Sequence, residues 1–168
     1  MLESLLAWLN SHSTSVVRDG AELRFHHHTG STSILVVRDA WIDGILPAAH
    51  EDLSSFYADY WAGSIGDGHV VIGTPIAGGI DVSHGYRIPD LAEMAATAAH
   101  LGLPESAGLE VFMQKGSWLF IYGLKLSDNV LFLYDHEFGD LKPLSGIEAV
   151  LNQWWEIELA DACLLYTS

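Results

Sequence analysis

The sequence predicts a single α+β domain, in which helices flank a mainly antiparallel sheet. Three observations support this prediction. Runs of β-branched and aromatic residues are joined by short turn segments, as in hairpins. Other segments carry apolar residues at intervals of three and four, which is the period of a helix face. The length of 168 residues, 49% of them hydrophobic, suits one domain with its own core.

The N-terminal part combines one helix with a β-rich segment. A first helix is predicted because four leucines share one face: Leu2, Leu5, Leu6 and Leu9. Glu3 stands where a signal peptide carries positive charge, so we expect a core helix and a cytoplasmic protein. Over about 14–40, Asp19-Gly20 predicts a two-residue hairpin loop, and Ile34 to Val37 predict a further strand.

Three further helices are predicted from periodicity and end signals. In the first, Pro47 suits the first helical position and Gly63 suits the end. Its apolar stripe consists of Leu53, Phe56, Tyr57 and Tyr60. The second begins with the capping pair Asp90 and Glu93, and its stripe is Leu91, Met94, Ala95, Ala98 and Leu101. The third has capping-box spacing and a stripe of its own: Ser145 and Glu148, then Ile147, Val150, Leu151 and Trp154.

The clearest β-unit is the segment 117–138, whose two apolar runs flank a loop at Ser127-Asp128-Asn129. Both faces of this predicted hairpin are apolar for most of its length. We therefore expect it in the middle of a sheet that is covered on both sides.

The charge balance restricts the class of partner. There are 22 Asp and Glu residues against 7 Lys and Arg, a net charge of -15. Little basic surface is left to displace counterions from a phosphate backbone, so we expect no nucleic-acid binding. A basic protein partner is favoured, because opposite fields speed encounter. No apolar run approaches a membrane span, and the single Cys163 excludes an internal disulfide.

The stretch LFLYDHEFGD (131–140) brings two carboxylates and an imidazole together in sequence. Successive side chains of a strand point to opposite faces, so Asp135 and Glu137 would share a face and His136 would point away. The three cannot then hold one ion or relay one proton. We interpret the stretch as a strand running out into solvent, with a polar binding rim as the alternative.

The triplet His26 to His28 is the next candidate site. His26 and His28 could share a strand face, but a third zinc ligand would have to come from elsewhere in the fold. We interpret the triplet as part of a polar edge strand. A GxSxG elbow is absent, and the glycines of 76–85 match no phosphate-binding loop. We therefore expect no catalytic residue, no metal and no cofactor.

Tryptophan is frequent for this length, and most of the six should be core residues: Trp8, Trp41, Trp61, Trp118, Trp154 and Trp155. The adjacent Trp154 and Trp155 cannot both face inward from one helix. One of them is therefore a candidate for a protein contact, and the alternative is coverage by the C-terminal tail.

From about residue 46 to 156, the order of parts resembles the SUKH superfamily. That group includes fungal Smi/Knr-type cell-wall regulators and bacterial toxin-immunity proteins. The similar parts are a Leu-Pro-led helix (46–63), a glycine-rich turn and strand (64–73), a central hairpin (111–140) and a closing helix (143–156). The turn lacks an expected Asn-Gly pair, and the β-rich segment has no counterpart. The final CLLYTS resembles translated sequencing adapters, so we expect the tail over 157–168 to include residues foreign to the natural protein.

The resemblance implies a non-enzymatic, immunity-type protein that neutralises a basic, nuclease-like toxin by binding it. We expect exposed carboxylates at turns to contact the toxin, with one aromatic anchor: Asp67, Asp128, Asp135, Glu137, Asp140 and Trp155. One alternative is a regulatory scaffold without a toxin partner. A second alternative, from another class, is a metal-dependent hydrolase that uses His26 and His28.

Overall fold

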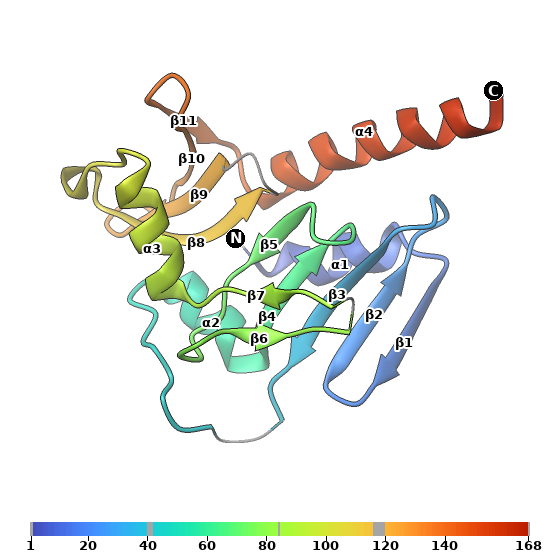
Figure 1. The fold of residues 1–168 in the computed structure, drawn as a ribbon, viewed down its shortest axis with the longest axis horizontal. Coiled ribbons are helices and arrows are strands. Elements are labelled where there is room, and N and C mark those ends of the chain that lie inside the picture. Colours follow the sequence, from blue (N-terminus) through green and yellow to red (C-terminus); the bar gives the residue numbers. More distant parts are fainter. Residues whose placement is uncertain (1, 40–41, 84, 116–119, 168) are drawn as a thin grey trace.

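The computed structural model describes residues 2–39, 42–83, 85–115 and 120–167, with side chains in the last helix as far as Cys163. The structure therefore does not describe Trp41, Trp118 or the first residues of the predicted 117–138 hairpin, and the predictions for them lie outside the described residues. Within the described residues, helices flank one large antiparallel sheet and a small two-stranded one (Figure 1). The predicted α+β class is confirmed.

The large sheet has nine strands, and their order in space is almost their order in the chain. From edge to edge it contains β1 (Ser15–Asp19), β2 (Glu22–His26), β3 (Thr32–Val37), β4 (Tyr60–Ile65), β5 (Val70–Ile72), β8 (Leu109–Lys115), β9 (Phe120–Lys125), β10 (Leu131–Asp135) and β11 (Asp140–Leu144). The interruption between β5 and β8 holds the small sheet, one α-helix and a 3-10 turn: β6 (Ile80–Asp81), β7 (Arg87–Ile88), α3 (Leu91–His100) and η1 (Glu105–Ala107).

Both faces of the inner strands are buried, whereas the edge strands β1 and β11 are exposed. Helices α1 (Ser4–Ser11), α2 (Glu51–Asp59) and α4 (Ile147–Thr167) contribute to the core on one face. On the other face the core includes α3, β7 and Val82. Neighbouring strand residues alternate between the two cores, as Ile121 and Tyr122 do in β9. Cover on both sides holds for the buried residues of β9 and β10, such as Leu131 and Tyr134, which belong to opposite cores. The hairpin does not lie in the middle of the sheet, because β10 is next to the edge strand β11.

Helix α2 starts and ends elsewhere than predicted. It begins at Glu51, not near Pro47, and it ends at Asp59. The carboxylate of Glu110 in β8 accepts hydrogen bonds from the backbone N–H groups of Ala49 (2.8 Å) and His50 (2.6 Å), which holds the preceding segment in an extended form. Tyr60 and Gly63 are strand residues of β4, not the end of the helix, because β4 pairs with both β3 and β5.

The other helices follow most of their predicted signals, but two residues of the predicted apolar faces, Leu6 of α1 and Ala95 of α3, are exposed. The Asp90 side chain caps α3 by accepting from the N–H of Glu93 at 2.7 Å. The predicted face of α4 is buried, from Ile147 to Trp154. The segment 157–167, predicted as a tail, continues α4 and runs out beyond the sheet (Figure 1). No Gly or Pro follows Ile147 to end the helix.

Three strand predictions need correction. The first hairpin loop is Gly20-Ala21, one residue later than predicted, because Asp19 pairs with Glu22. His26 ends β2, which lies between β1 and β3 and is therefore not an edge strand. The strand through Asp135 does not run out into solvent: it turns over 136–139 and returns as β11.

Three tryptophans and four histidines pack together where α1, the β2–β3 connection and α4 meet. We call them the His–Trp cluster: Trp8, His12, His27, His28, His69, Trp154 and Trp155. The rings of Trp8 and His12 stack with centroids 3.9 Å apart. The indole N–H of Trp8 donates to the Asn152 side-chain oxygen at 2.9 Å, which ties α1 to α4.

His27 is the most buried imidazole of this cluster, only 4% exposed. Its Nδ1 lies 2.6 Å from the backbone carbonyl of His12, and its Nε2 lies 2.7 Å from the Ser33 hydroxyl. Nδ1–H donates to the carbonyl and Nε2 accepts from the hydroxyl, which satisfies a neutral ring. Burial lowers the pKa of His27, against an opposing effect of the His12 carbonyl. Burial also lowers the pKa of His69, and Lys115 adds to that effect.

Stability should therefore fall on acidification. The unfolded chain binds a proton near the ordinary pKa of 6.5, whereas folded His27 and His69 bind it only at lower pH. Their contribution to the free energy of unfolding is complete above that pH and is lost as the pH drops below it. Urea titrations at about pH 7.5 and about pH 5, followed by tryptophan fluorescence, measure this loss. His27→Gln should reduce it, and the exposed control His100→Gln should not. If His27→Gln loses as much stability between the two pH values as the wild type, His27 does not contribute to the pH dependence.

A second prediction concerns Gly66, whose φ is +61°. A Cβ at this position would lie 2.3 Å from the Trp154 indole, whereas at Gly20, with φ +60°, it would meet nothing within 4 Å. Both Ala variants carry the same backbone strain, so their difference isolates the indole contact. We expect Gly66→Ala to lower the free energy of unfolding by about 2 kcal/mol more than Gly20→Ala. If urea denaturation gives the same decrease in the free energy of unfolding for both variants, α4 can shift away from residue 66 without loss of stability.

Candidate functional site

The β10–β11 hairpin lies at one edge of the large sheet, and its turn projects from the fold (Figure 1). The turn covers residues 136–139, and Gly139 has a φ of +68°, which an L-residue rarely adopts. The Asp135 carboxylate accepts a hydrogen bond from the N–H of Glu137 at 3.0 Å. Local hydrogen bonding of this kind is typical of Asp in turns, and it defines the shape of the hairpin end.

An aromatic ring stands among carboxylates at this turn. Phe138 is 74% exposed, the largest fraction of any exposed large hydrophobic residue in the described part of the chain. Asp135, Glu137 and Asp140 are its near neighbours in the hairpin. We call these four residues the acidic tip. Exposed aromatic side chains ringed by polar groups are frequent at the centres of protein interfaces.

The acidic tip carries uncompensated charge. Asp135 and Asp140 are direct partners across the β10–β11 pair, so two like charges face each other. Such a pair destabilises a hairpin by roughly 0.2–1 kcal/mol. Among the described residues, neither carboxylate forms an ion pair within 4.0 Å. A Lys or Arg from another molecule would relieve this repulsion.

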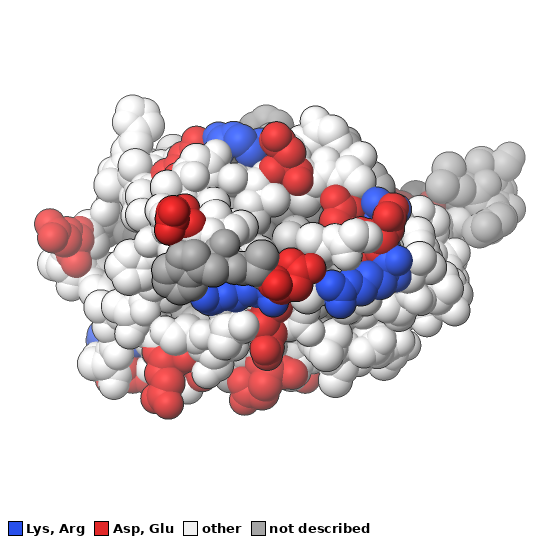
Figure 2. Space-filling model, turned by 90° about the horizontal axis from the view of Figure 1, so that it is seen from below, with Lys and Arg blue, Asp and Glu red and all other residues white. Residues whose placement is uncertain are grey.

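Few basic residues remain to balance the acidic ones elsewhere. Four of the seven pair with carboxylates of the chain itself: Arg18, Arg24, Arg87 and Lys125. Arg38 and Lys115 lie over the rings of Trp61 and Phe120. Figure 2 shows carboxylates in several separate groups on one face, with Lys and Arg beside some of them. With 22 acidic residues against seven basic ones, there are too few Lys and Arg side chains to pair with most of the carboxylates.

The structure gathers three of the predicted contact residues, Asp135, Glu137 and Asp140, at the acidic tip. Asp128 lies in the β9–β10 turn, at the opposite end of β10, roughly 17 Å away by strand length. Its carboxylate is 3.3 Å from Lys125 Nζ. Asp67 lies in the β4–β5 turn, where its side chain accepts from the N–H of Thr32 at 3.1 Å.

The aromatic anchor differs from the predicted one. Trp155 is half-buried and packs edge-on against Trp8, His12 and His28, so much of its ring is already covered. Phe138 is not among the predicted contact residues, because the sequence indicates a strand through this position, with the ring on one face of the sheet. Gly139-Asp140 directly after it is a turn signal that could have identified it as a tip residue.

The histidine triplet separates in space. His26 Nδ1 lies 3.3 Å from the Thr32 hydroxyl, His27 is enclosed in the His–Trp cluster, and His28 contacts the Trp155 ring. Across the described residues, no group of three His, Cys, Asp or Glu side chains is arranged to hold a metal ion. The described helices also include none of the length and apolar character that a bilayer span needs.

Comparison with family models, curated proteins and solved structures finds no match to this chain. The functional assignment therefore depends on the geometry and charge of the molecule itself.

Asp140→Lys should stabilise the hairpin, because it converts the repulsive pair with Asp135 into an attractive one. We expect the free energy of unfolding to rise by about 0.5 kcal/mol in low salt, and less in high salt. Urea denaturation at two salt concentrations measures the difference. Asp128→Lys is the matched control, since it disrupts an attractive neighbour and should not stabilise. A decrease in stability for Asp140→Lys would refute the repulsion.

Proposed function

We propose that this chain is a cytoplasmic, non-enzymatic protein-binding domain of the immunity type, which neutralises a basic toxin domain. The acidic tip carries this proposal: an exposed aromatic ring and three carboxylates share one projecting turn. The two opposed carboxylates destabilise the free hairpin and would be stabilised by basic groups of a partner. This is the arrangement expected of a surface that is completed by binding.

The partner's chemistry follows from that of the tip. The carboxylates would pair with Lys or Arg, and the ring would enter an apolar pocket beside them. Full burial of a Phe side chain contributes about 1.5–3 kcal/mol. Domains that cut nucleic acids have basic substrate grooves, which a row of carboxylates can occupy as a phosphate mimic. We therefore propose a nuclease-type toxin as the partner.

The SUKH resemblance supports the same proposal from the order of segments. The Leu-Pro-led segment leads into α2, the glycine-rich stretch forms the turn before β5, and the closing segment forms α4. Toxin-immunity proteins are one large part of that superfamily. A regulatory scaffold would use the same surface with a different partner. The hydrolase alternative has no supporting geometry, because His26 and His28 contact different neighbours.

An immunity protein is expected to be encoded beside its toxin, so binding to the product of the neighbouring gene tests the proposal. We expect the wild-type chain to form a one-to-one complex and to restore growth of cells that express the toxin. Phe138→Ala should weaken binding about tenfold, because the aromatic anchor is lost. Glu137→Lys should also weaken it about tenfold and should reduce its dependence on salt. Calorimetry at two salt concentrations measures both effects.

Glu105→Lys is the matched control, because it makes the same charge change on the exposed η1 turn. It should leave affinity within about twofold of the wild type. No complex with the neighbouring gene product would reject the immunity assignment. A complex that is unaffected by Phe138→Ala and Glu137→Lys would reject the acidic tip as the contact surface.

A further inference from the structure

The two edges of the large sheet differ in their protection against further pairing. Strand β11 carries Lys142 and Pro143, and Pro143 has no N–H group to offer to another strand. Lys and Pro on an edge strand are features that prevent pairing with a second chain. Strand β1, with the sequence Ser-Val-Val-Arg-Asp, contains neither of them. The β1 edge is therefore the more open of the two.

Every residue of β1 is exposed, and two adjacent ones are apolar. Val16 is 41% exposed and Val17 is 48% exposed. Their side chains lie on opposite faces of the sheet, because successive residues of a strand alternate. Valine is typical of strands that pair on both sides, so two exposed valines on an unprotected edge favour contact with another strand.

The register of the first hairpin determines which backbone groups of β1 face outward. Asp19 and Glu22 flank the two-residue loop and are therefore a hydrogen-bonded pair. Every second residue of β1 belongs to such a pair with β2, and the residues between them point their N–H and C=O groups the other way. Those residues are Val16 and Arg18. Within the described residues, no strand lies on that outer side of β1.

The strand is complementary to a second copy of itself. In an antiparallel pair of β1 strands centred on Val17, Val16 lies opposite Arg18 of the second copy, and Ser15 lies opposite Asp19. The outward N–H and C=O groups of Val16 and Arg18 then bond each other on both sides of the centre. The Ser15 hydroxyl can donate to the Asp19 carboxylate. No like charges are directly opposite, and the two Val17 side chains meet at the axis.

The charge of the first hairpin also permits a second copy to approach. The segment 15–26 contains two basic residues, Arg18 and Arg24, and two acidic ones, so its formal net charge is zero. Arg24 lies 3.1 Å from the carboxylates of both Asp19 and Glu22. The whole chain, in contrast, has a net charge of -15. Two such chains repel least where each presents a neutral segment.

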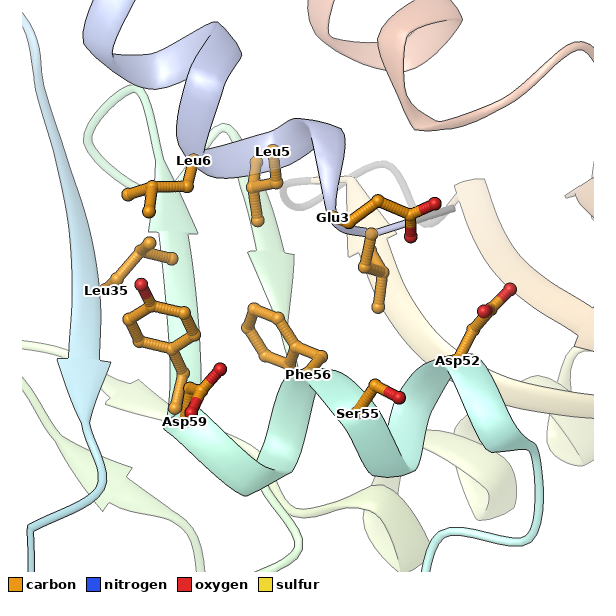
Figure 3. Close-up of a pocket in the computed structure, with 10 residues that line it drawn as sticks. Glu3, Leu5, Leu6, Leu35, Asp52, Ser55, Phe56 and Asp59 are labelled. Carbon is orange, nitrogen blue, oxygen red and sulfur yellow. The ribbon is translucent and has the colours of Figure 1, made fainter.

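The apolar groove between α1 and α2 does not suit a second copy in the same way. Leu6 and Phe56 line this groove, and Figure 3 shows the carboxylates of Glu3, Asp52 and Asp59 around them. A second acidic chain would bring further negative charge to these carboxylates. The β1 edge combines exposed apolar side chains with outward backbone groups and a neutral surrounding.

We propose that β1 is a homodimer interface, in which two copies pair antiparallel through their β1 edges about a two-fold axis at Val17. A five-residue strand pair buries little surface, so the dimer is weak, with a dissociation constant of about 10–100 µM. The β10–β11 hairpin lies at the opposite edge of the sheet, so each copy keeps it free. The dimer does not depend on the function proposed above.

Sedimentation velocity over about 5–500 µM protein tests the association. We expect the wild-type chain to shift from monomer toward dimer as its concentration rises. Salt should strengthen the dimer, because it screens the repulsion between two chains of charge -15. Val17→Lys should weaken association about tenfold, because it places two ammonium groups opposite each other. The added Lys lowers the net negative charge, so a nonspecific charge effect would have the opposite sign.

Leu141→Lys is the matched control, because it makes the same change at an exposed position of the other edge strand, β11. It should leave the dissociation constant within about twofold of the wild-type value. A wild-type chain that stays monomeric over the whole range would overturn the proposal, and so would a dimer that Val17→Lys leaves intact.

Disulfide formation tests the register of the strand pair. Residues opposite each other in a non-hydrogen-bonded pair have Cα atoms about 4.5 Å apart, which a disulfide can bridge. In a Cys163→Ser background, Val17→Cys should therefore give a covalent dimer on oxidation with diamide. Val16→Cys is the control: its counterpart in the second copy lies about 8 Å away, beyond disulfide range. Equal cross-linking of the two variants would reject the pairing centred on Val17.

Discussion

The packing of Trp154 against the Gly66 turn is the contact on which the arrangement of this molecule depends. The indole fills the space that a Cβ of residue 66 would occupy, at 2.3 Å. Only glycine therefore allows α4 to lie against the β4–β5 turn. His27 and Trp8 pack around the same indole, so one side chain joins the N-terminal helix, the β2–β3 connection and the last helix. With α1 held in this way, its residues Leu5 and Leu6 line a groove together with Phe56 of α2.

The histidines that gather in space and the carboxylates assigned to binding have different roles. His27 has both ring nitrogens within hydrogen-bond distance of protein oxygens and is enclosed by tryptophans, so its neutral form is a structural element. The carboxylates of the acidic tip have the opposite environment: they are at a turn, near an exposed ring and opposite one another. A folded chain keeps such a repulsive pair only at a cost in stability, which complex formation would offset.

Local signals predicted the elements that depend on local interactions. The cap of α3 is an interaction within four residues, and the buried stripe of α4 is a property of one helix. The start of α2 was missed because its preceding N–H groups bind Glu110, about sixty residues away. Strand β11 was missed because Lys142 and Pro143 have low strand propensity, and an exposed edge strand tolerates both.

By itself, the sequence determined the fold class, the acidity, most helix faces and the hairpin segments, because periodicity and turn chemistry act over a few residues. It also identified Asp135, Glu137 and Asp140 as candidate contact residues. Only the tertiary structure decided that these three share one turn with Phe138, whereas Asp67 binds a neighbouring strand and Trp155 packs on histidines. It alone brought residues of α1, β3 and α2 together around one groove. Side chains from distant segments come together only when those segments pack against each other. A local sequence pattern extends over a few residues and therefore does not predict which segments pack.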